Sequence, residues 1–146
     1  MPQPFRLFAP PAAPAERVLL VSSGELNLAL PIGLVREVLV SAPVTHQGTS
    51  STITYRDLDE TKTVPVVLGR RPCPEGFAGT LVLMRTESLV GGLLAIACTD
   101  LPRLASVTAT EWEAGSALPH PWDGGEKSYC QGDRSYAFCR GIQPKA

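Results

Sequence analysis

The chain has few of the residues that catalysis or metal binding usually needs. It contains two histidines and four cysteines, and no two of its cysteines form a CxxC pair. Structural zinc sites usually draw their ligands in close pairs, so His46 or His120 would have to join the cysteines from far away in the sequence. The sequence therefore predicts no metal site and no cofactor.

Long stretches of one charge are also absent. The formal net charge is −1, from 13 basic and 14 acidic residues, and no run of like charge is longer than a pair such as Arg70-Arg71. Nucleic acids and anionic membrane surfaces attract proteins through clustered positive charge. We therefore expect neither nucleic acid nor a membrane surface as a partner.

The chain also lacks a long hydrophobic segment. Its longest uncharged, mostly apolar stretch, Ser88 to Thr99, is shorter than the roughly 20 residues that a membrane-spanning helix needs, and it contains two glycines. Residues 1–16, MPQPFRLFAPPAAPAE, carry five prolines in place of the charged and apolar regions of an export signal. We expect these residues to form a flexible Pro-rich arm, and the protein to be cytoplasmic, with reduced thiols and no membrane insertion.

Common catalytic motifs are missing as well. The sequence has no GxSxG elbow, no HExxH and no phosphate-binding GxxxxGK[ST]. The acidic segment from Asp57 to Lys62 is typical of a solvated turn, and Gly91-Gly92 is predicted to lie inside an apolar strand. His46 falls in a polar segment with no acid or second histidine beside it, which favours a solvated side chain. We therefore predict that the protein is not an enzyme.

What the sequence does contain is a series of short apolar runs. The segment from Arg17 to Val40 changes its hydrophobic period three times. An apolar run at Val18–Val21 and a turn are followed by Leu26, Leu28 and Leu30, which alternate with other residues at a period of two. The pattern predicts a hairpin that ends at Pro31, then one helical turn and a further strand.

The rest of the chain repeats this short-strand pattern. The polar segment Ser41 to Thr52 predicts a loop, and Pro65 inside Thr63–Gly69 predicts an edge strand or a strand beginning just after the proline. Thr80–Arg85 and Leu89–Cys98 predict a hairpin that is covered on both faces. A weak helix start is expected near Thr108. About eight to ten short strands and little helix favour a closed or doubled β-barrel over an open sheet.

Several short motifs, in their order and spacing, resemble those of one family. A strand that ends in Pro31 leads into Val35-Arg36-Glu37-Val38, and Arg56 precedes Val64-Pro65-Val66-Val67. Val90-Gly91-Gly92-Leu93 and Tyr129-Cys130-Gln131-Gly132 follow in the expected order. Together these segments resemble the CheW-like domain, the family of chemotaxis coupling proteins.

The chain departs from the family pattern at five places, one of which is the six-residue charged turn 57–62 before the proline strand. Asp57 follows Arg56 where the family has glycine, and Leu68 and Ile96 stand where aspartates are expected. The segment 46–51 replaces a loop rich in proline and glycine. The sequence is thus identified as a divergent member of the family.

The resemblance implies an all-β fold of two small five-stranded SH3-like β-barrels packed on a shared apolar core, with little helix. Residues 17–146 would form this single domain after the arm. It also implies a non-catalytic signalling adaptor, of the chemotaxis or type IV pilus motility type. Such an adaptor couples the cytoplasmic tip of a chemoreceptor to the regulatory domain of a histidine kinase. The partner-binding residues that the resemblance implies are Val35, Glu37, Val38, Arg56, Val64 and Pro65.

Other interpretations stay open at this point. The two valines of the motif could be core residues, Glu37 a solvated charge and Arg56 an internal brace. The chain could instead be a small-molecule-binding β-barrel or a thiol-dependent enzyme that uses Cys98 or Cys130. It could also be an adaptor that has lost one contact and serves another pathway. Cys130 and Cys139 could face each other across a hairpin, although buried thiols are the simpler expectation.

Overall fold

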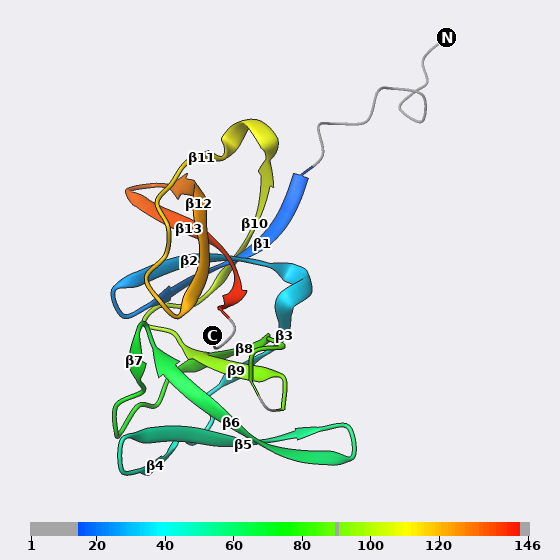
Figure 1. The fold of residues 1–146 in the computed structure, drawn as a ribbon, viewed down its shortest axis with the longest axis vertical. Coiled ribbons are helices and arrows are strands. Elements are labelled where there is room, and N and C mark those ends of the chain that lie inside the picture. The colour runs from blue at the N-terminus through cyan, green and yellow to red at the C-terminus, as the bar shows by residue number, and fades with distance from the viewer. Residues whose placement is uncertain (1–14, 90, 144–146) are drawn as a thin grey trace.

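The computed structural model describes residues 15–89 and 91–143, and these are almost entirely β-structure. They form two curled sheets, which lie one above the other in Figure 1. The helical segments within this part of the chain are two single 3₁₀ turns, η2 (Ile32–Leu34) and η3 (Ala109–Glu111). The turn after Pro31 and the weak helix start near Thr108 are therefore confirmed, the latter through a capping box between Thr108 and Glu111.

Each sheet has five long strands and short strands at its margins. Sheet A contains, in spatial order, β10 (Arg103–Thr108), β1 (Ala15–Ser23), β2 (Leu26–Pro31), β13 (Arg134–Ile142), β12 (Trp122–Gln131) and β11 (Glu113–Ala114). Sheet B contains β3 (Val35–Val40), β8 (Thr80–Arg85), β9 (Leu93–Ala97), β6 (Glu60–Leu68), β5 (Ser50–Asp57) and β4 (Thr45–Gln47), with β7 (Arg71–Pro72) paired to β6. The fold class expected from the sequence is confirmed.

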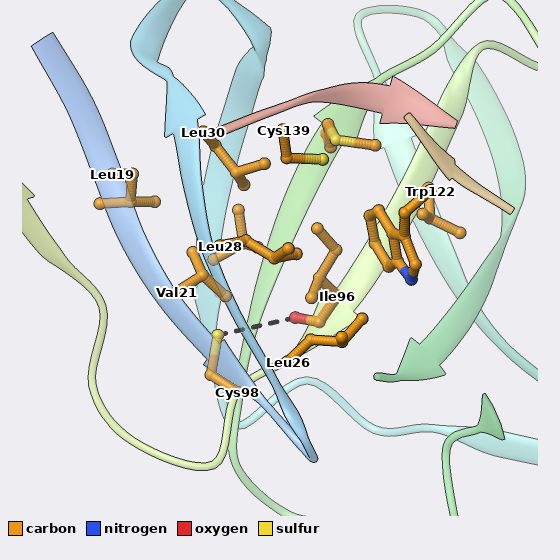
Figure 2. Close-up of a cluster of buried hydrophobic side chains, with 12 residues drawn as sticks. Leu19, Val21, Leu26, Leu28, Leu30, Ile96, Cys98, Trp122 and Cys139 are labelled. Carbon is orange, nitrogen blue, oxygen red and sulfur yellow. Dashed lines mark hydrogen bonds between the residues drawn. The ribbon is translucent and has the colours of Figure 1, made fainter. Parts of the chain in front are cut away.

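Three clusters of buried apolar side chains stabilise the two sheets. We call the first the shared core, because both sheets contribute to it (Figure 2). Its buried members are Leu19, Val21, Leu26, Leu28, Leu30, Val82, Met84, Leu94, Ile96, Cys98, Trp122 and Cys139. The sheet A core consists of Val18, Leu20, Ala29, Val107 and Tyr136. The sheet B core consists of Ile53, Tyr55, Val64, Val66, Cys73, Leu81, Leu83, Leu93, Ala95 and Ala97.

Strand alternation explains why one strand can serve two clusters. In β1, Leu19 and Val21 enter the shared core, whereas Val18 and Leu20 enter the sheet A core. The strand β8 does the same between the shared core and the sheet B core, with all but its last residue buried. The prediction that the β8–β9 hairpin is covered on both faces is therefore confirmed.

Two strand boundaries differ from the sequence-based expectation. Gly91 and Gly92 lie outside β9, in the turn before it, with φ angles of 90° and 74°. These values are in the left-handed region that favours glycine, so the prediction that the pair lies inside a strand was wrong. The segment Ser41–Thr52 is also not one loop, because it contains β4 and the start of β5.

The sequence predicted that Pro65 lies at a sheet edge or just before a strand, but it lies inside β6. The strand β6 lies between β5 and β9. Pro65 opposes Thr52 of β5, and pairing with β9 begins only at Val66. The proline therefore precedes the stretch in which β6 is paired on both sides, which makes its missing N–H tolerable inside the sheet.

No helix in the described part of the chain is long and apolar enough to cross a membrane. Most of the arm expected for residues 1–16 lies outside the described residues. Ala15 and Glu16 belong to β1.

Candidate functional site

The strand β3, which carries the Val35–Val38 motif, lies at one end of the strand order in sheet B. It pairs with β8, but the register shifts between Val35, opposite Met84, and Glu37, opposite Leu83. Arg36 is thus an extra residue in a β-bulge. A regular strand would point Arg36 and Glu37 to opposite faces. The bulge explains why both side chains instead reach β5.

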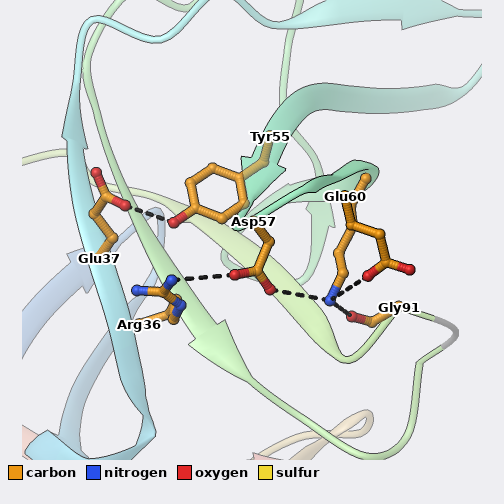
Figure 3. A network of polar contacts seen from close by, with 7 residues as sticks. Arg36, Glu37, Tyr55, Asp57, Glu60 and Gly91 are labelled. Carbon is orange, nitrogen blue, oxygen red and sulfur yellow. Dashed lines mark hydrogen bonds and ion pairs between the residues drawn. The ribbon is translucent and has the colours of Figure 1, made fainter.

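Two cations share the carboxylate of Asp57, at the end of β5 (Figure 3). Arg36 Nη2 lies 3.1 Å from Asp57 Oδ1, and Lys62 Nζ lies 3.1 Å from Asp57 Oδ2. Lys62 also donates a hydrogen bond of 3.0 Å to the carbonyl oxygen of Gly91. This chain of contacts joins β3, the β5–β6 hairpin and the turn before β9.

A second bond ties β3 to β5. The hydroxyl of Tyr55 donates a hydrogen bond of 2.5 Å to Glu37 Oε1. This bond and burial of the ring raise the pKa of Tyr55, since both favour the neutral phenol. Conversely, the hydrogen bonds from Lys62 and Arg36 lower the pKa of Asp57 and keep it ionised. Each shift stabilises the protonation state already present at neutral pH, so the network braces β3 rather than activating a group.

The residues of the Val35–Val38 motif have different environments. Val35 is half-buried and packs against the shared core. Glu37 is exposed and holds Tyr55. Val38 is 38% exposed, and Val40 further along β3 is 75% exposed. The free part of β3 is therefore its second half, which presents apolar side chains to solvent.

The other predicted contact residues divide between the two faces of the β5–β6 hairpin. Val64 opposes Ile53, is 1% exposed and belongs to the sheet B core. It has no surface to offer a partner, so its predicted contact role is not compatible with the structure. Arg56 and Pro65 alternate with these inward-facing residues and lie on the opposite face of the hairpin. Arg56 is exposed, and Pro65 is half-buried.

Sequence reasoning missed one exposed residue of this hairpin. Leu58 is 85% exposed at the tip of the β5–β6 turn, with a φ of 58°. Leucine in the left-handed region is uncommon, because its Cβ approaches the following carbonyl oxygen. The available signal was an isolated leucine between charged residues in Asp57-Leu58-Asp59. That segment was instead interpreted as a wholly solvated turn.

A groove lies beside the Arg36–Asp57–Lys62 contacts. Its volume is about 610 Å³, and it extends from Leu58 to the Gly91-Gly92 turn and Arg85. Cationic and acidic side chains both line it. A groove with this mixed charge at the edge of a sheet suits contact with a protein better than the enclosure of an apolar ligand.

Cys98 does not have the low thiol pKa that a reactive cysteine needs. Burial raises the pKa of Cys98 to about 12, so its thiolate is scarce at neutral pH. Burial likewise raises the pKa of Cys139 to about 12. Cys130 opposes Ser135 and not Cys139, and it is exposed rather than buried as expected. All four cysteines are free.

Neither histidine builds a metal or catalytic centre in the described residues. The structure contains no group of three or more potential metal-ligating side chains in residues 15–89 and 91–143. His46 Nδ1 lies 3.2 Å from Ser51 Oγ, and Ser51 donates to the carbonyl oxygen of Cys73. Because the Ser51 hydroxyl donates its proton to the carbonyl oxygen of Cys73, it is not available for catalysis. The two side chains instead connect β4, β5 and the segment around Cys73.

Two departures from the family pattern are core positions in this chain. Ile96 is fully buried in the shared core, and Leu68 is half-buried against the sheet B core. Apolar side chains at both positions therefore contribute packing, and neither offers a charge to a partner.

The comparisons with known proteins give one structural match of interest. The chain is similar in structure to the scaffolding protein TtCheW from Thermoanaerobacter tengcongensis. The TM-score is 0.58 at 14% sequence identity, over 86% of this chain and 89% of that chain. No protein-family model matches the sequence, and no curated protein matches it. The similarity supports a CheW-like fold.

Proposed function

We propose that this chain is a non-catalytic signalling adaptor that couples chemoreceptors to a histidine kinase, in chemotaxis or in type IV pilus motility. The observation that carries the proposal is its structural similarity, over most of both chains, to a protein described as a CheW scaffold. The departures from the family pattern at Asp57 and in segment 46–51 lie in and beside β5, and we propose that contacts there are specific to this chain.

The proposed contact surface, which we call the β3 surface, consists of Glu37, Val38, Val40 and Leu58. Val38, Val40 and Leu58 are large apolar side chains that are 38%, 75% and 85% exposed. Glu37 lies on the same strand but faces the side of Leu39 and the sheet B core, where it accepts the Tyr55 hydrogen bond, whereas Val38 and Val40 face the other side. We propose that Val38 and Val40 on β3, and Leu58 on the β5–β6 turn near Arg36, each supply exposed apolar area to a signalling contact of modest size.

The polar network supports this proposal because it holds the surface in a fixed shape. Arg36 and Glu37 tie β3 to β5 through Asp57 and Tyr55. A partner that binds β3 would then not have to order the strand first, which lowers the entropic cost of association. Arg56 and Pro65 lie on the other face of the β5–β6 hairpin, where they are proposed to form a separate and smaller contact.

Binding to the isolated regulatory domain of a co-encoded histidine kinase tests the proposal. We expect Glu37→Lys and Val40→Asp each to raise the Kd about tenfold or more, as loss of a central contact does. Titration calorimetry with the purified full chain would measure this. Circular dichroism and urea unfolding would establish that each variant remains folded.

A matched control comes from the other sheet. Leu101 is 77% exposed, close to the 75% of Val40, but it precedes β10 in sheet A. Leu101→Asp is expected to bind the kinase domain like the unmodified chain. Equal losses for Leu101→Asp and Val40→Asp, or no loss for either, would contradict the assignment to the β3 surface. No binding by the unmodified chain would contradict the proposed function.

A further inference from the structure

A group of aromatic rings in sheet A has no role in the β3 surface. Trp112 meets Phe138 edge-on, with the ring centroids 5.6 Å apart at an interplanar angle of 90°, and it meets Tyr129 at 6.4 Å and 68°. We call these three residues the aromatic cluster. All three are only partly buried, and Trp112 and Tyr129 pack against the sheet A core. The rings are therefore supported on their inner side and partly exposed, and Arg140 lies over Phe138 at 5.8 Å.

One lysine links this cluster to the beginning of the described chain. Lys127 Nζ lies 4.5 Å from the ring centroids of both Trp112 and Phe138, in cation–π contact. The same ammonium lies 3.4 Å from Glu16 Oε1. Glu16 is the second residue of β1. The chain thus leaves β1 toward its N-terminus from a point that is one ion pair away from the aromatic cluster.

Strand pairing places the cluster within reach of the preceding residues. Ala15 pairs with Thr108, and Trp112 follows Thr108 by four residues. Four residues span at most about 14 Å. The five residues from Pro10 to Pro14 span about 16 Å if they adopt a polyproline II conformation, at 3.1 Å per residue. They can therefore extend from Ala15 across the cluster without any further linker.

The composition of residues 1–14, MPQPFRLFAPPAAP, suits an aromatic surface. The segment has prolines at positions 2, 4, 10, 11 and 14, and Pro11-Ala-Ala-Pro14 has the PxxP spacing. Proline-rich segments bind grooves lined by aromatic side chains because the extended helix is stiff before binding and loses little entropy. Trp and Tyr rings supply flat apolar area for such contacts.

The charges are complementary as well. Arg6 is the only charged side chain in residues 1–14. Glu111 and Glu113 flank Trp112 in the sequence and are exposed, whereas Glu126, before Lys127, is already paired with Arg140 at 2.6 Å. An arginine entering this acidic margin would be attracted at low ionic strength.

We propose that the aromatic cluster is a docking site for a proline-rich segment, and that residues 1–14 of the same chain occupy it. The prolines from Pro10 to Pro14 pack on Trp112 and Tyr129, and Arg6 faces the acidic margin. The arm then covers apolar surface on sheet A while leaving the β3 surface on sheet B free. Because the arm is tethered beside its site, its effective concentration is on the order of millimolar, so weak docking suffices to cover the rings.

The two tryptophans provide both a reporter and a control. Trp112 belongs to the cluster, whereas Trp122 is 2% exposed in the shared core and donates its indole N–H to the carbonyl oxygen of Gly69 at 3.2 Å. Each gives one indole N–H signal in an NMR spectrum of the ¹⁵N-labelled full chain. Trp112→Phe identifies the signals, because it removes one of them.

The test compares two triple variants of the full chain. In one, the prolines at 10, 11 and 14 are replaced by glycine; in the matched control, the alanines at 9, 12 and 13 are replaced by serine. We expect the proline variant to shift the Trp112 signal and to speed its exchange with water several-fold, with Trp122 unchanged. The alanine variant should resemble the unmodified chain. A synthetic peptide of residues 1–14 added to the proline variant should return the Trp112 signal toward its original position.

Three results would overturn the proposal. A Trp112 signal that is the same in the unmodified chain and the proline variant would show that the arm does not lie on the cluster. A Trp112 signal in the unmodified chain that depends on protein concentration would assign the site to the arm of a second copy. An unchanged Trp112 signal on addition of the peptide would exclude the segment as its ligand. None of these results bears on binding of the kinase domain to sheet B.

Discussion

The β5–β6 and β12–β13 hairpins close in the same way but with different residues. Each has a two-residue turn, between the pair Asp57 and Glu60 in one and Gln131 and Arg134 in the other. The first turn residue is left-handed in both, with φ values of 58° at Leu58 and 66° at Gly132. Glycine adopts this conformation without steric cost, whereas leucine does not.

The two hairpins also differ in the regularity of their pairing. The β5–β6 ladder runs without a register shift, whereas the β12–β13 ladder shifts on both sides of Gly124. In β12–β13, glycine thus stands where the backbone is irregular or tightly turned. In β5–β6, an exposed leucine occupies the one position where glycine would suit the fold better. This difference is consistent with the proposal that Leu58 contacts a partner rather than adding stability.

The largest predicted effect concerns the irregular ladder. Gly124 has a φ of 136°, and a Cβ there would collide with the carbonyl oxygen of Phe138. Gly124→Ala should lower the free energy of unfolding by about 2–4 kcal/mol, from strain and overpacking together. Urea unfolding measures this. The control is Gly33→Ala, because a Cβ at Gly33 meets no atom within 4 Å; similar losses for both variants would show that the bulge is not the cause.

The second largest effect on stability is expected when Gly132 of the β12–β13 turn is replaced by leucine, the residue at the equivalent position of the β5–β6 turn. A Cβ at Gly132 meets nothing within 4 Å, so a substitution there acts through backbone conformation alone. Gly132→Leu should lower the free energy of unfolding by about 1–2 kcal/mol. If thermal and urea unfolding of this variant matched those of the unmodified chain, left-handed leucine would carry no measurable cost in this fold, and the comparison between the two turns would fail.

A smaller effect is expected for the bond that fixes β3. Tyr55→Phe removes the hydrogen bond to Glu37 and should lower the free energy of unfolding by about 1 kcal/mol near neutral pH. Because the folded-state pKa of Tyr55 is raised, the contribution is complete below the unfolded-state pKa of about 10 and is lost as pH rises through the folded-state pKa.

Urea unfolding at a series of pH values tests this dependence. The difference in stability between the unmodified chain and Tyr55→Phe should stay constant from neutral pH to near the ordinary tyrosine pKa, and should then shrink. A difference that persists unchanged at higher pH would contradict the assignment of the Tyr55–Glu37 bond. The stability that Asp57 adds behaves in the opposite way. Because its pKa is lowered, its contribution to the free energy of unfolding is present at neutral pH and is lost only as pH falls below the usual carboxylate range.

Much of the fold could be predicted from local patterns. The alternation of Leu26, Leu28 and Leu30 correctly placed a wall of the shared core, and the apolar β8–β9 segments correctly indicated burial on both faces. Strand alternation also contained the information that Val64 and Pro65 face opposite sides of β6, although both were predicted as contacts. The Gly91-Gly92 turn was missed although a Gly-Gly pair between two apolar runs is a turn signal, because the pair was assigned to the apolar run around it.

The candidate site was less predictable because its contacts join distant segments. The Arg36 bulge depends on how β3 pairs with β8, and the Tyr55–Glu37 bond depends on the curl of sheet B. Neither leaves a periodic signal in the sequence. The exposure and the left-handed backbone of Leu58 result from the two-residue turn that contains it. Neither property could be predicted before the length of that turn was known.

One substitution tests the central claim most directly, because the fold and the proposed function predict opposite effects for it. Leu58→Gly relieves the left-handed strain and should raise the free energy of unfolding by about 0.5–1 kcal/mol. It also removes an apolar contact from the β3 surface and should raise the Kd for the kinase regulatory domain about tenfold. Titration calorimetry on the full chain gives this Kd. A more stable variant that binds with an unchanged Kd would contradict the claim that Leu58 is retained for binding.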